Sequence, residues 1–173
     1  MKKNIAYHFV GEKLRDGRPV PPDGKWLIHK GNIKMCDSGL HASLTPFDAL
    51  QYAPGSILCR VRYGGRVILG DDKLVCTRRL IEARFAATEL MRSFARKRAL
   101  SVIHLWEAPD VVKKYMETGD ESLRSAVWSA AWSAARAAAW SAACDAASDA
   151  ARAAAATEFN NLVYAEFKRQ EDV

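Results

Sequence analysis

The sequence predicts an α+β protein in which a small β-rich half precedes an all-helical half with a long alanine-rich helix. Residues 1–77 hold most of the turn-forming residues and several short runs rich in β-branched and aromatic side chains. From Arg78 onward glycine and proline nearly vanish, and alanine dominates residues 125–156. With 173 residues, of which 49% are hydrophobic, the chain is long enough to bury one core. We therefore expect a β-rich module over 1–77 and a helical module over 78–173, packed as one globular unit.

Five short runs in the first half predict the strands of a small sheet. Each combines apolar, β-branched or aromatic residues and is bounded by turn-forming sequence such as DGRPVPPDG, SG, APG, GG and GDD. The runs are NIAYHFV, KWLIH, SILCRVRY, RVIL and KLVCT.

A short helix is predicted inside the β-rich half, within SGLHASLTPFDALQYAPG. Thr45 supplies a hydroxyl cap, Pro46 suits the first helical position, and Asp48 is a carboxylate three residues beyond the cap. Pro54 and Gly55 end the helix after about two turns. The residues just before it, including His41 and Ser43, should end a strand near the positive end of the helix, where a ligand could bind.

The second half predicts a series of helices. The segment from Arg78 to Trp106 is rich in helix-forming residues. APDVVKKYMETGD adds a short helix closed by Gly119, and Asp120 or Ser122 can cap the helix that follows.

The alanine-rich tract over 125–156 advances in steps of four residues. Because an α-helix turns about 100° per residue, Trp128, Trp132 and Trp140 fall at about 0°, 40° and 120° and form a drifting stripe. This stripe could pack against the chain's own helices. It could also dock on a second copy of the chain or on another protein, because tryptophan is a common anchor at interfaces. The sequence is compatible with both packing within the chain and docking on another chain.

The formal net charge of +6 is concentrated in one segment, in which basic residues outnumber acidic ones between Arg78 and Arg98. Arg92, Arg96, Lys97 and Arg98 form its densest part. Such a cluster attracts phosphates in nucleic acid or a dinucleotide, or an acidic protein surface. An ordinary solvated helix face is the alternative.

The sequence lacks the motifs that are typical of several function classes. The chain has no Walker sequence, GxSxG, HExxH or GxGxxG. Its four cysteines are scattered without a CxxC pair, so we expect reduced thiols and no metal site. No run of about 18 apolar residues predicts a membrane span, and the N-terminus lacks a signal-peptide core. We expect a cytoplasmic protein that does not bind membranes.

Most of the chain resembles a family of small, mostly uncharacterised bacteriophage proteins. The resemblance rests on GLHASLTPFDALQYAPG, DDKLVCTRRLIEA, WEAPDVVKKYMETGDESLR and the alanine-rich AAW/AAR tail. It implies a viral origin, and hence the cytoplasm of an infected bacterial host, without implying an activity.

The β-rich half also resembles small ADP-ribosyltransferases of the rifampin-modifying type. AYHFV is similar to their first strand, GLHASLTPFDALQYA to their second motif, and SILCRVRYGGRVI to the next strand pair. The resemblance implies an ADP-ribosyltransferase-like sheet that binds NAD. In it His8 would orient the cofactor, His41 would occupy the stacking position usually held by tyrosine, and Ser43 and Tyr52 would line the pocket.

Transfer from NAD also needs a carboxylate to stabilise positive charge on the ribose. No motif fixes that residue, and the nearby candidates are Asp71, Asp72 and Glu82. We assign the catalytic roles to His8 and Glu82.

Two functions from different classes follow. The first is a phage accessory protein that binds and inhibits a host or defence component, in the manner of an anti-CRISPR, through its helical half. Its predicted partner-binding residues are Arg92, Arg96, Lys97, Arg98, Trp128, Trp132 and Trp140. The alternative is an NAD-dependent, ADP-ribosyltransferase-like effector that modifies a host target. Nucleic-acid binding by the basic helix and self-association through the alanine–tryptophan helix are further possibilities.

Overall fold

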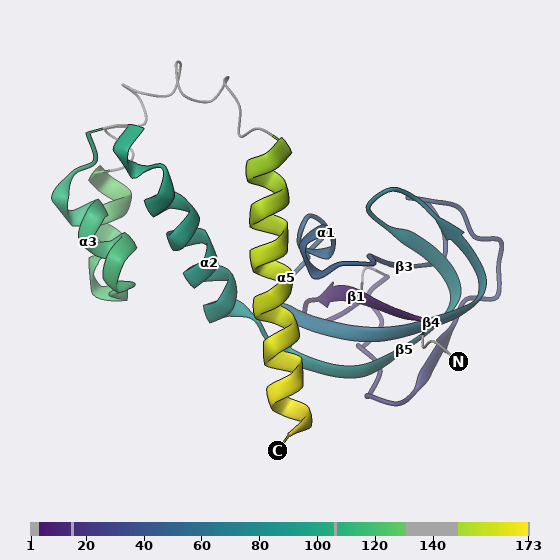
Figure 1. Cartoon of the computed structure of the whole chain (residues 1–173). Coiled ribbons are helices and arrows are strands. Elements are labelled where there is room, and N and C mark those ends of the chain that lie inside the picture. The colour runs from purple at the N-terminus through teal and green to yellow at the C-terminus, as the bar shows by residue number, and fades with distance from the viewer. Residues whose placement is uncertain (1–3, 15, 106, 131–148, 173) are drawn as a thin grey trace. The chain divides into compact units, whose positions relative to one another are not determined.

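The computed structural model describes residues 4–14, 16–105, 107–130 and 149–172, which fold as two compact units (Figure 1). The sheet unit contains the described residues up to Thr88 and those from Ala156 onward. The helical unit lies between them in sequence, over Glu89–Ala155. The predicted α+β class is confirmed, with an antiparallel sheet first and helices later.

The sheet has five antiparallel strands that curl into a small barrel. They are β1 (Ile5–Val10), β2 (Trp26–Ile28), β3 (Leu40–Ala42), β4 (Ile57–Leu69) and β5 (Leu74–Ala86). The order is β1-β4-β5-β2, and β3 pairs with the start of β5 beside β2. Tyr7 on β1 exchanges two backbone hydrogen bonds with Ser43, just after β3, at 2.7 and 2.9 Å. This bridge connects β3 back to β1, so β1, β4, β5 and β3 surround a common interior.

The Gly64–Gly65 pair was expected to be a turn between two strands, and this expectation was wrong. β4 continues through both glycines, and its register against β5 shifts between Gly64 and Val67. Gly65 has a φ of 75°, and a Cβ atom there would collide with the Thr77 hydroxyl. Two adjacent glycines therefore allow a bulge that bends the long strand instead of ending it.

The helix expected from Arg78 onward is also wrong for residues 78–86. These residues continue β5, and the first helix of this region is α2 (Thr88–Ser101). Arg, Leu, Glu and Ala in RRLIEARFA favour helix when considered alone. Pairing along β4 and burial of Leu80 and Ile81 outweigh that local preference.

The predicted cap of the short helix α1 (Pro46–Leu50) is confirmed. The Thr45 hydroxyl accepts a hydrogen bond from the Asp48 backbone N–H at 3.1 Å, and Pro46 occupies the first turn. The helix ends at Leu50, before Pro54.

The C-terminal helix α5 (Asp149–Glu171) covers the sheet unit with its second part (Figure 1). Phe159, Val163 and Phe167 are all at most 2% exposed. The Phe167 ring lies 5.1 Å from the Phe85 ring on β5, between centroids. The backbone N–H of Phe47 also donates to the Asn160 side chain of α5, at 2.9 Å. The barrel therefore depends on a helix that is distant in sequence.

The helical unit contains α2, α3 (Asp110–Thr118) and two short 3₁₀ turns at Ile103–Leu105 and Glu121–Leu123. Gly119 ends α3 in the left-handed conformation, with a φ of 69°, and Asp120 caps the following turn, as predicted. Residues 124–130 and 149–156 are helical, whereas most of the predicted long alanine-rich helix lies outside the described residues. Within the described part, no helix has the length and apolarity needed to cross a bilayer.

Candidate functional site

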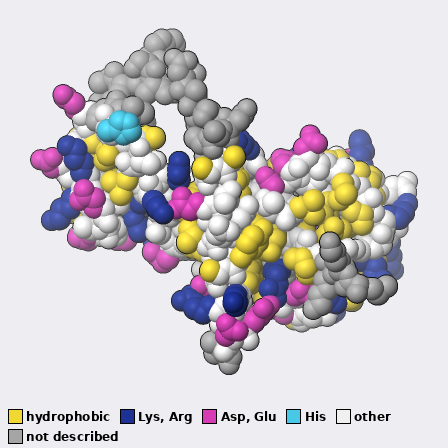
Figure 2. Space-filling view, in the orientation of Figure 1, with side chains coloured by type: hydrophobic (Ala, Val, Ile, Leu, Met, Phe, Trp, Pro, Cys, Tyr) yellow, Lys and Arg dark blue, Asp and Glu magenta, His cyan; other side chains and the backbone are white. Residues whose placement is uncertain are grey.

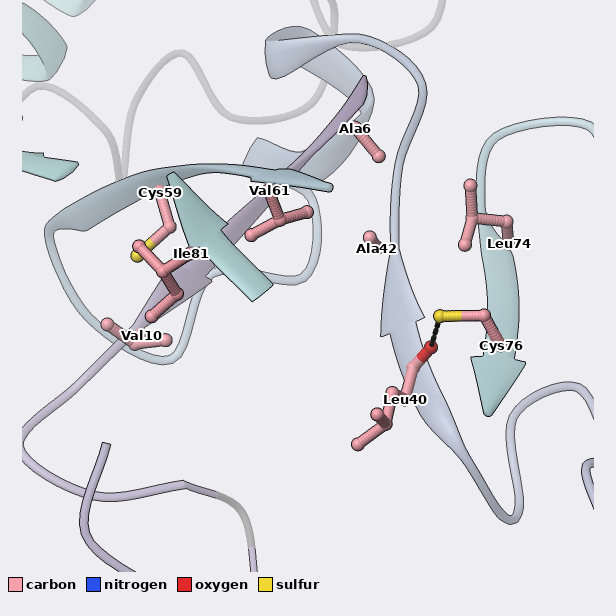
Figure 3. Close-up of a cluster of buried hydrophobic side chains, with 9 residues drawn as sticks. All are labelled: Ala6, Val10, Leu40, Ala42, Cys59, Val61, Leu74, Cys76 and Ile81. Atoms are coloured by element: carbon pink, nitrogen blue, oxygen red, sulfur yellow. Dashed lines mark hydrogen bonds between the residues drawn. The ribbon is translucent and has the colours of Figure 1, made fainter. Parts of the chain in front are cut away.

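The interior of the barrel is lined by side chains from four strands (Figure 3). All of them are at most 7% exposed, and apart from two thiols they are aliphatic. They are Ala6 and Val10 of β1, Leu40 and Ala42 of β3, Cys59 and Val61 of β4, and Leu74, Cys76 and Ile81 of β5. A polar group in this interior is therefore in an apolar environment.

His8 belongs to the interior face of β1. It lies between Ala6 and Val10 in sequence and is paired with Cys59, all three of which contribute to the interior cluster. Because alternate residues of a strand share a face, its imidazole lies on the interior side. Burial, with further contributions from Arg79 and His41, holds the pKa of His8 well below its usual value. His8 is therefore neutral at physiological pH.

Arg79 on β5 is the charged residue of this interior. It is 7% exposed, and one of its terminal nitrogens, Nη1, donates a hydrogen bond to the backbone carbonyl of His41. Burial lowers the pKa of Arg79 to about 10, so the guanidinium keeps its charge. Among the described residues, no carboxylate lies within ion-pairing distance of it. We call the His8 side chain, the His41 backbone carbonyl and the Arg79 guanidinium the His–Arg cluster.

Arg79 was not predicted as a site residue, because it was assigned to the basic segment of a predicted helix. Once residues 74–86 are known to be a strand, alternation places Arg79 on the same face as Ile81. The sequence signal that could have identified Arg79 is an arginine at a position that alternates with core residues along a strand.

His41 and Ser43, at the end of β3, have well-defined partners. The Nε2 atom of His41 accepts a hydrogen bond from the backbone N–H of Cys36 at 3.0 Å. The neutral imidazole therefore carries its proton on Nδ1. Ser43 is 2% exposed, and its backbone forms the bridge to Tyr7. Ser43 thus holds the barrel closed beside the cluster.

Tyr52 lies at the turn between β4 and β5 rather than among the interior side chains. Its hydroxyl donates to the Asp72 carboxylate and accepts a hydrogen bond from Lys73 Nζ at 2.9 Å. Lys73 Nζ lies 4.3 Å from the centroid of the Tyr52 ring. Hydrogen bonds with Tyr52 and with the Cys36 thiol raise the pKa of Lys73. This polar group lies at the surface, where Tyr52 is 48% exposed.

Glu82 lies on the opposite face of the sheet from His8. Its carboxylate forms ion pairs with Arg62 and with Arg60, the latter at 3.8 Å from Nε to Oε2. Arg60 in turn lies 5.2 Å from the ring centroid of Phe167 on α5 and pairs with Glu171. Glu82 thus helps to fix α5 to the sheet. The structure brings His8 and His41 together but does not bring Glu82 to them.

The partner-binding candidates lie in the helical unit. Arg92 pairs with Glu89 and Glu121 at 3.1 and 3.6 Å, and the Arg96 guanidinium packs beside Gly119. Lys97 is exposed, whereas Arg98 is partly buried. Figure 2 shows basic and acidic side chains interspersed over this unit, so the view shows no uniformly basic face.

Trp128 is 72% exposed, the largest exposure among the exposed large hydrophobic side chains of the described residues. Trp132 and Trp140, the other two predicted anchors, lie outside the described residues.

Metal chemistry finds no support in the described part of the chain. There, no three His, Cys, Asp or Glu side chains are grouped so that they could hold a metal ion.

The fold and the interior cluster define a small antiparallel β-barrel domain with a buried cation. Residues 4–93 match a family described as a domain of unknown function (DUF7666), and the chain belongs to this family. No curated protein and no solved structure matches the chain. The match covers the barrel and the start of α2. Because the family is described without an activity, function has to be argued from the site.

Replacing His8 with glutamine should flatten the dependence of stability on pH. The folded-state pKa of His8 lies below its unfolded value of about 6.5, so the unfolded chain takes up this proton first as the pH falls. Its contribution to stability is complete above that value and is lost below it, at up to about 1.4 kcal/mol per pH unit. Urea denaturation between neutral pH and about pH 5 tests this expectation.

The matched control is His104→Gln, which removes an exposed histidine of the helical unit. It should retain the slope of the wild-type protein. Equal slopes for His8→Gln and the wild type would contradict the account of His8.

Proposed function

We propose that this chain is a binding protein that acts by occupying a host or defence protein, as an anti-CRISPR does, and that its helical unit makes the contact. The observation that supports this best is the exposure of Trp128. Its neighbour Val127 is only 8% exposed, so the helical segment 124–130 has a buried side and presents its tryptophan to solvent. Exposed tryptophans are frequent anchors of protein interfaces.

The position of Glu82 favours binding over catalysis. Transfer of ADP-ribose from NAD needs a carboxylate near the ribose. The assigned residue instead pairs with Arg60 and Arg62 on the face that α5 covers. Asp72 is engaged by Tyr52 at the turn between β4 and β5, and Asp71 is exposed there. A binding role needs no such group.

Affinity capture from bacterial lysate, followed by binding measurements with the purified captured protein, tests the contact. Trp128→Ala should weaken binding at least about tenfold, because truncating a central tryptophan anchor typically costs 2 kcal/mol or more. Leu69→Ala is the matched control, since Leu69 is 62% exposed but belongs to the barrel. Equal affinities of the wild type and Trp128→Ala would overturn the assignment to the helical unit.

Two other ligands of the helical unit would give different results. Self-association through Trp128 would appear in sedimentation as a dimer that Trp128→Ala dissociates. Nucleic-acid binding by α2 would weaken steeply as salt is raised.

A second candidate is NAD binding by the barrel, and the specific observation in its favour is the proximity of His8 and His41. These residues, which the resemblance assigns to NAD, are close enough for His41 to contribute to the lowered pKa of His8. Isothermal titration with NAD should give binding that His41→Ala abolishes. No heat of binding at millimolar NAD would remove this candidate.

A further inference from the structure

The barrel interior contains a positive charge without a counter-ion. Arg79 is 7% exposed on the face of β5 that lines the apolar interior, and within the described residues it has no carboxylate partner. Burying an unpaired charge costs several kcal/mol, and buried arginines are normally paired. The neighbouring Arg84 shows the usual solution, because its Nε lies 3.1 Å from the Asp23 carboxylate.

The groups around Arg79 do not supply the missing negative charge. Burial raises the pKa of the Cys59 thiol to about 12 and also raises that of Cys76, so both remain protonated. His8 is neutral, and His41 offers its backbone carbonyl, which is a dipole rather than a charge. None of these groups therefore neutralises the charge of Arg79.

The guanidinium retains donors for a negatively charged group. A guanidinium has five N–H donors, and Arg79 uses Nη1 for the carbonyl of His41. Buried side-chain nitrogens that lack both a hydrogen-bond partner and solvent contact include Arg60 Nε and Arg62 Nε. No nitrogen of Arg79 belongs to this group, so the guanidinium nitrogens that make no hydrogen bond keep slight contact with solvent.

We propose that the barrel binds a phosphate group through Arg79, with the imidazole of His8 beside it. The planar guanidinium fork matches phosphate and carboxylate oxygens. Phosphate is the better match to the cluster, because its additional oxygens can face the imidazole of His8 while a carboxylate has only two oxygens. Free phosphate and a phosphate ester share this chemistry.

The site does not depend on the protein-binding function proposed above. Trp128 belongs to the helical unit, whereas Arg79 belongs to the barrel. Trp128→Ala should therefore leave phosphate binding unchanged, and the two proposals can fail separately.

Isothermal titration and thermal melts of the full chain test the proposal with inorganic phosphate as the probe. Phosphate should bind the wild type and raise its melting temperature beyond the effect of chloride at equal ionic strength. Arg79→Met should abolish both signals. Arg84→Met, which removes a paired arginine from the same strand, should retain them. The variants also control for the general stabilising effect of phosphate on folded proteins.

Three outcomes would overturn the proposal: no binding of phosphate by the wild type at millimolar concentration, an unchanged signal in Arg79→Met, or acetate binding as tightly as phosphate. If Arg79→Met does not fold, Arg79→Lys keeps the charge without the fork and should bind at least about tenfold more weakly. The source of the phosphate is then distinguished by comparing inorganic phosphate, a simple phosphate monoester and NAD. Tighter binding of an ester indicates a phosphorylated metabolite, and tightest binding of inorganic phosphate indicates the free ion.

Discussion

Phe159→Ala should lower the free energy of unfolding of the barrel by about 3–5 kcal/mol, the usual cost of truncating a fully buried phenylalanine. Phe159 is 0% exposed and meets the Phe47 ring edge-on, with 6.1 Å between the ring centroids. The substitution leaves a cavity between α5 and α1, which nearby side chains can fill only partly. Urea denaturation followed by hydrogen exchange in β4 and β5 reports on the barrel itself.

The matched control for this prediction is Leu162→Ala on the same helix. Leu162 is 43% exposed, so its truncation should change stability by less than about 1 kcal/mol. Equal losses in both variants would mean that α5 contributes through its helicity rather than through the packing of Phe159.

The helix α5 belongs to the barrel although it lies far from the strands in the sequence. The family match ends at residue 93, yet the helix that covers the barrel comes after the helical unit, at residues 156–171. The chain therefore leaves the barrel, forms the helical unit and returns to complete the core.

Arg79→Met should change stability in the opposite direction and raise the free energy of unfolding of the ligand-free protein by about 1–3 kcal/mol. Replacing a buried charge with an apolar side chain of similar size removes its desolvation cost. The lost hydrogen bond to the carbonyl of His41 offsets about 1 kcal/mol of that gain. Urea denaturation without phosphate or sulfate measures the net effect.

Arg84→Met again provides the comparison, because it breaks an ion pair with Asp23 and should not stabilise the chain. Destabilisation by Arg79→Met of more than about 1 kcal/mol would show that this arginine is needed for the fold. A stabilised variant that no longer responds to phosphate would instead show that the chain retains a costly residue for binding.

Local signals predicted much of the fold. The strand runs around His8 and Cys59, the Thr45 cap and the Gly119 helix end depend on residues close in sequence, and all are confirmed. The predictions failed where distant partners decide the structure. Residues 78–86 form a strand because β4 pairs with them. Gly64 and Gly65 lie in a bulge rather than a turn because residues 67–69 continue the pairing with β5.

The candidate site was predictable only in part, for the same reason. The resemblance singled out His8 and His41, which the barrel brings together on β1 and β3. The surroundings of Arg79 and Glu82 could not be predicted, because they depend on which face of β5 each residue occupies. The helix predicted over residues 78–86 therefore concealed the buried cation and the face of the sheet on which Glu82 lies.

The central claim is that Arg79 binds a phosphate group. It is tested most directly by crystallography with selenate, a tetrahedral oxyanion whose anomalous scattering identifies it. The account predicts an anomalous peak in the barrel interior, with selenate oxygens roughly 3 Å from the Arg79 guanidinium nitrogens. Selenate found only at other sites, with the Arg79 guanidinium in contact with water or a carboxylate of the chain, would contradict it.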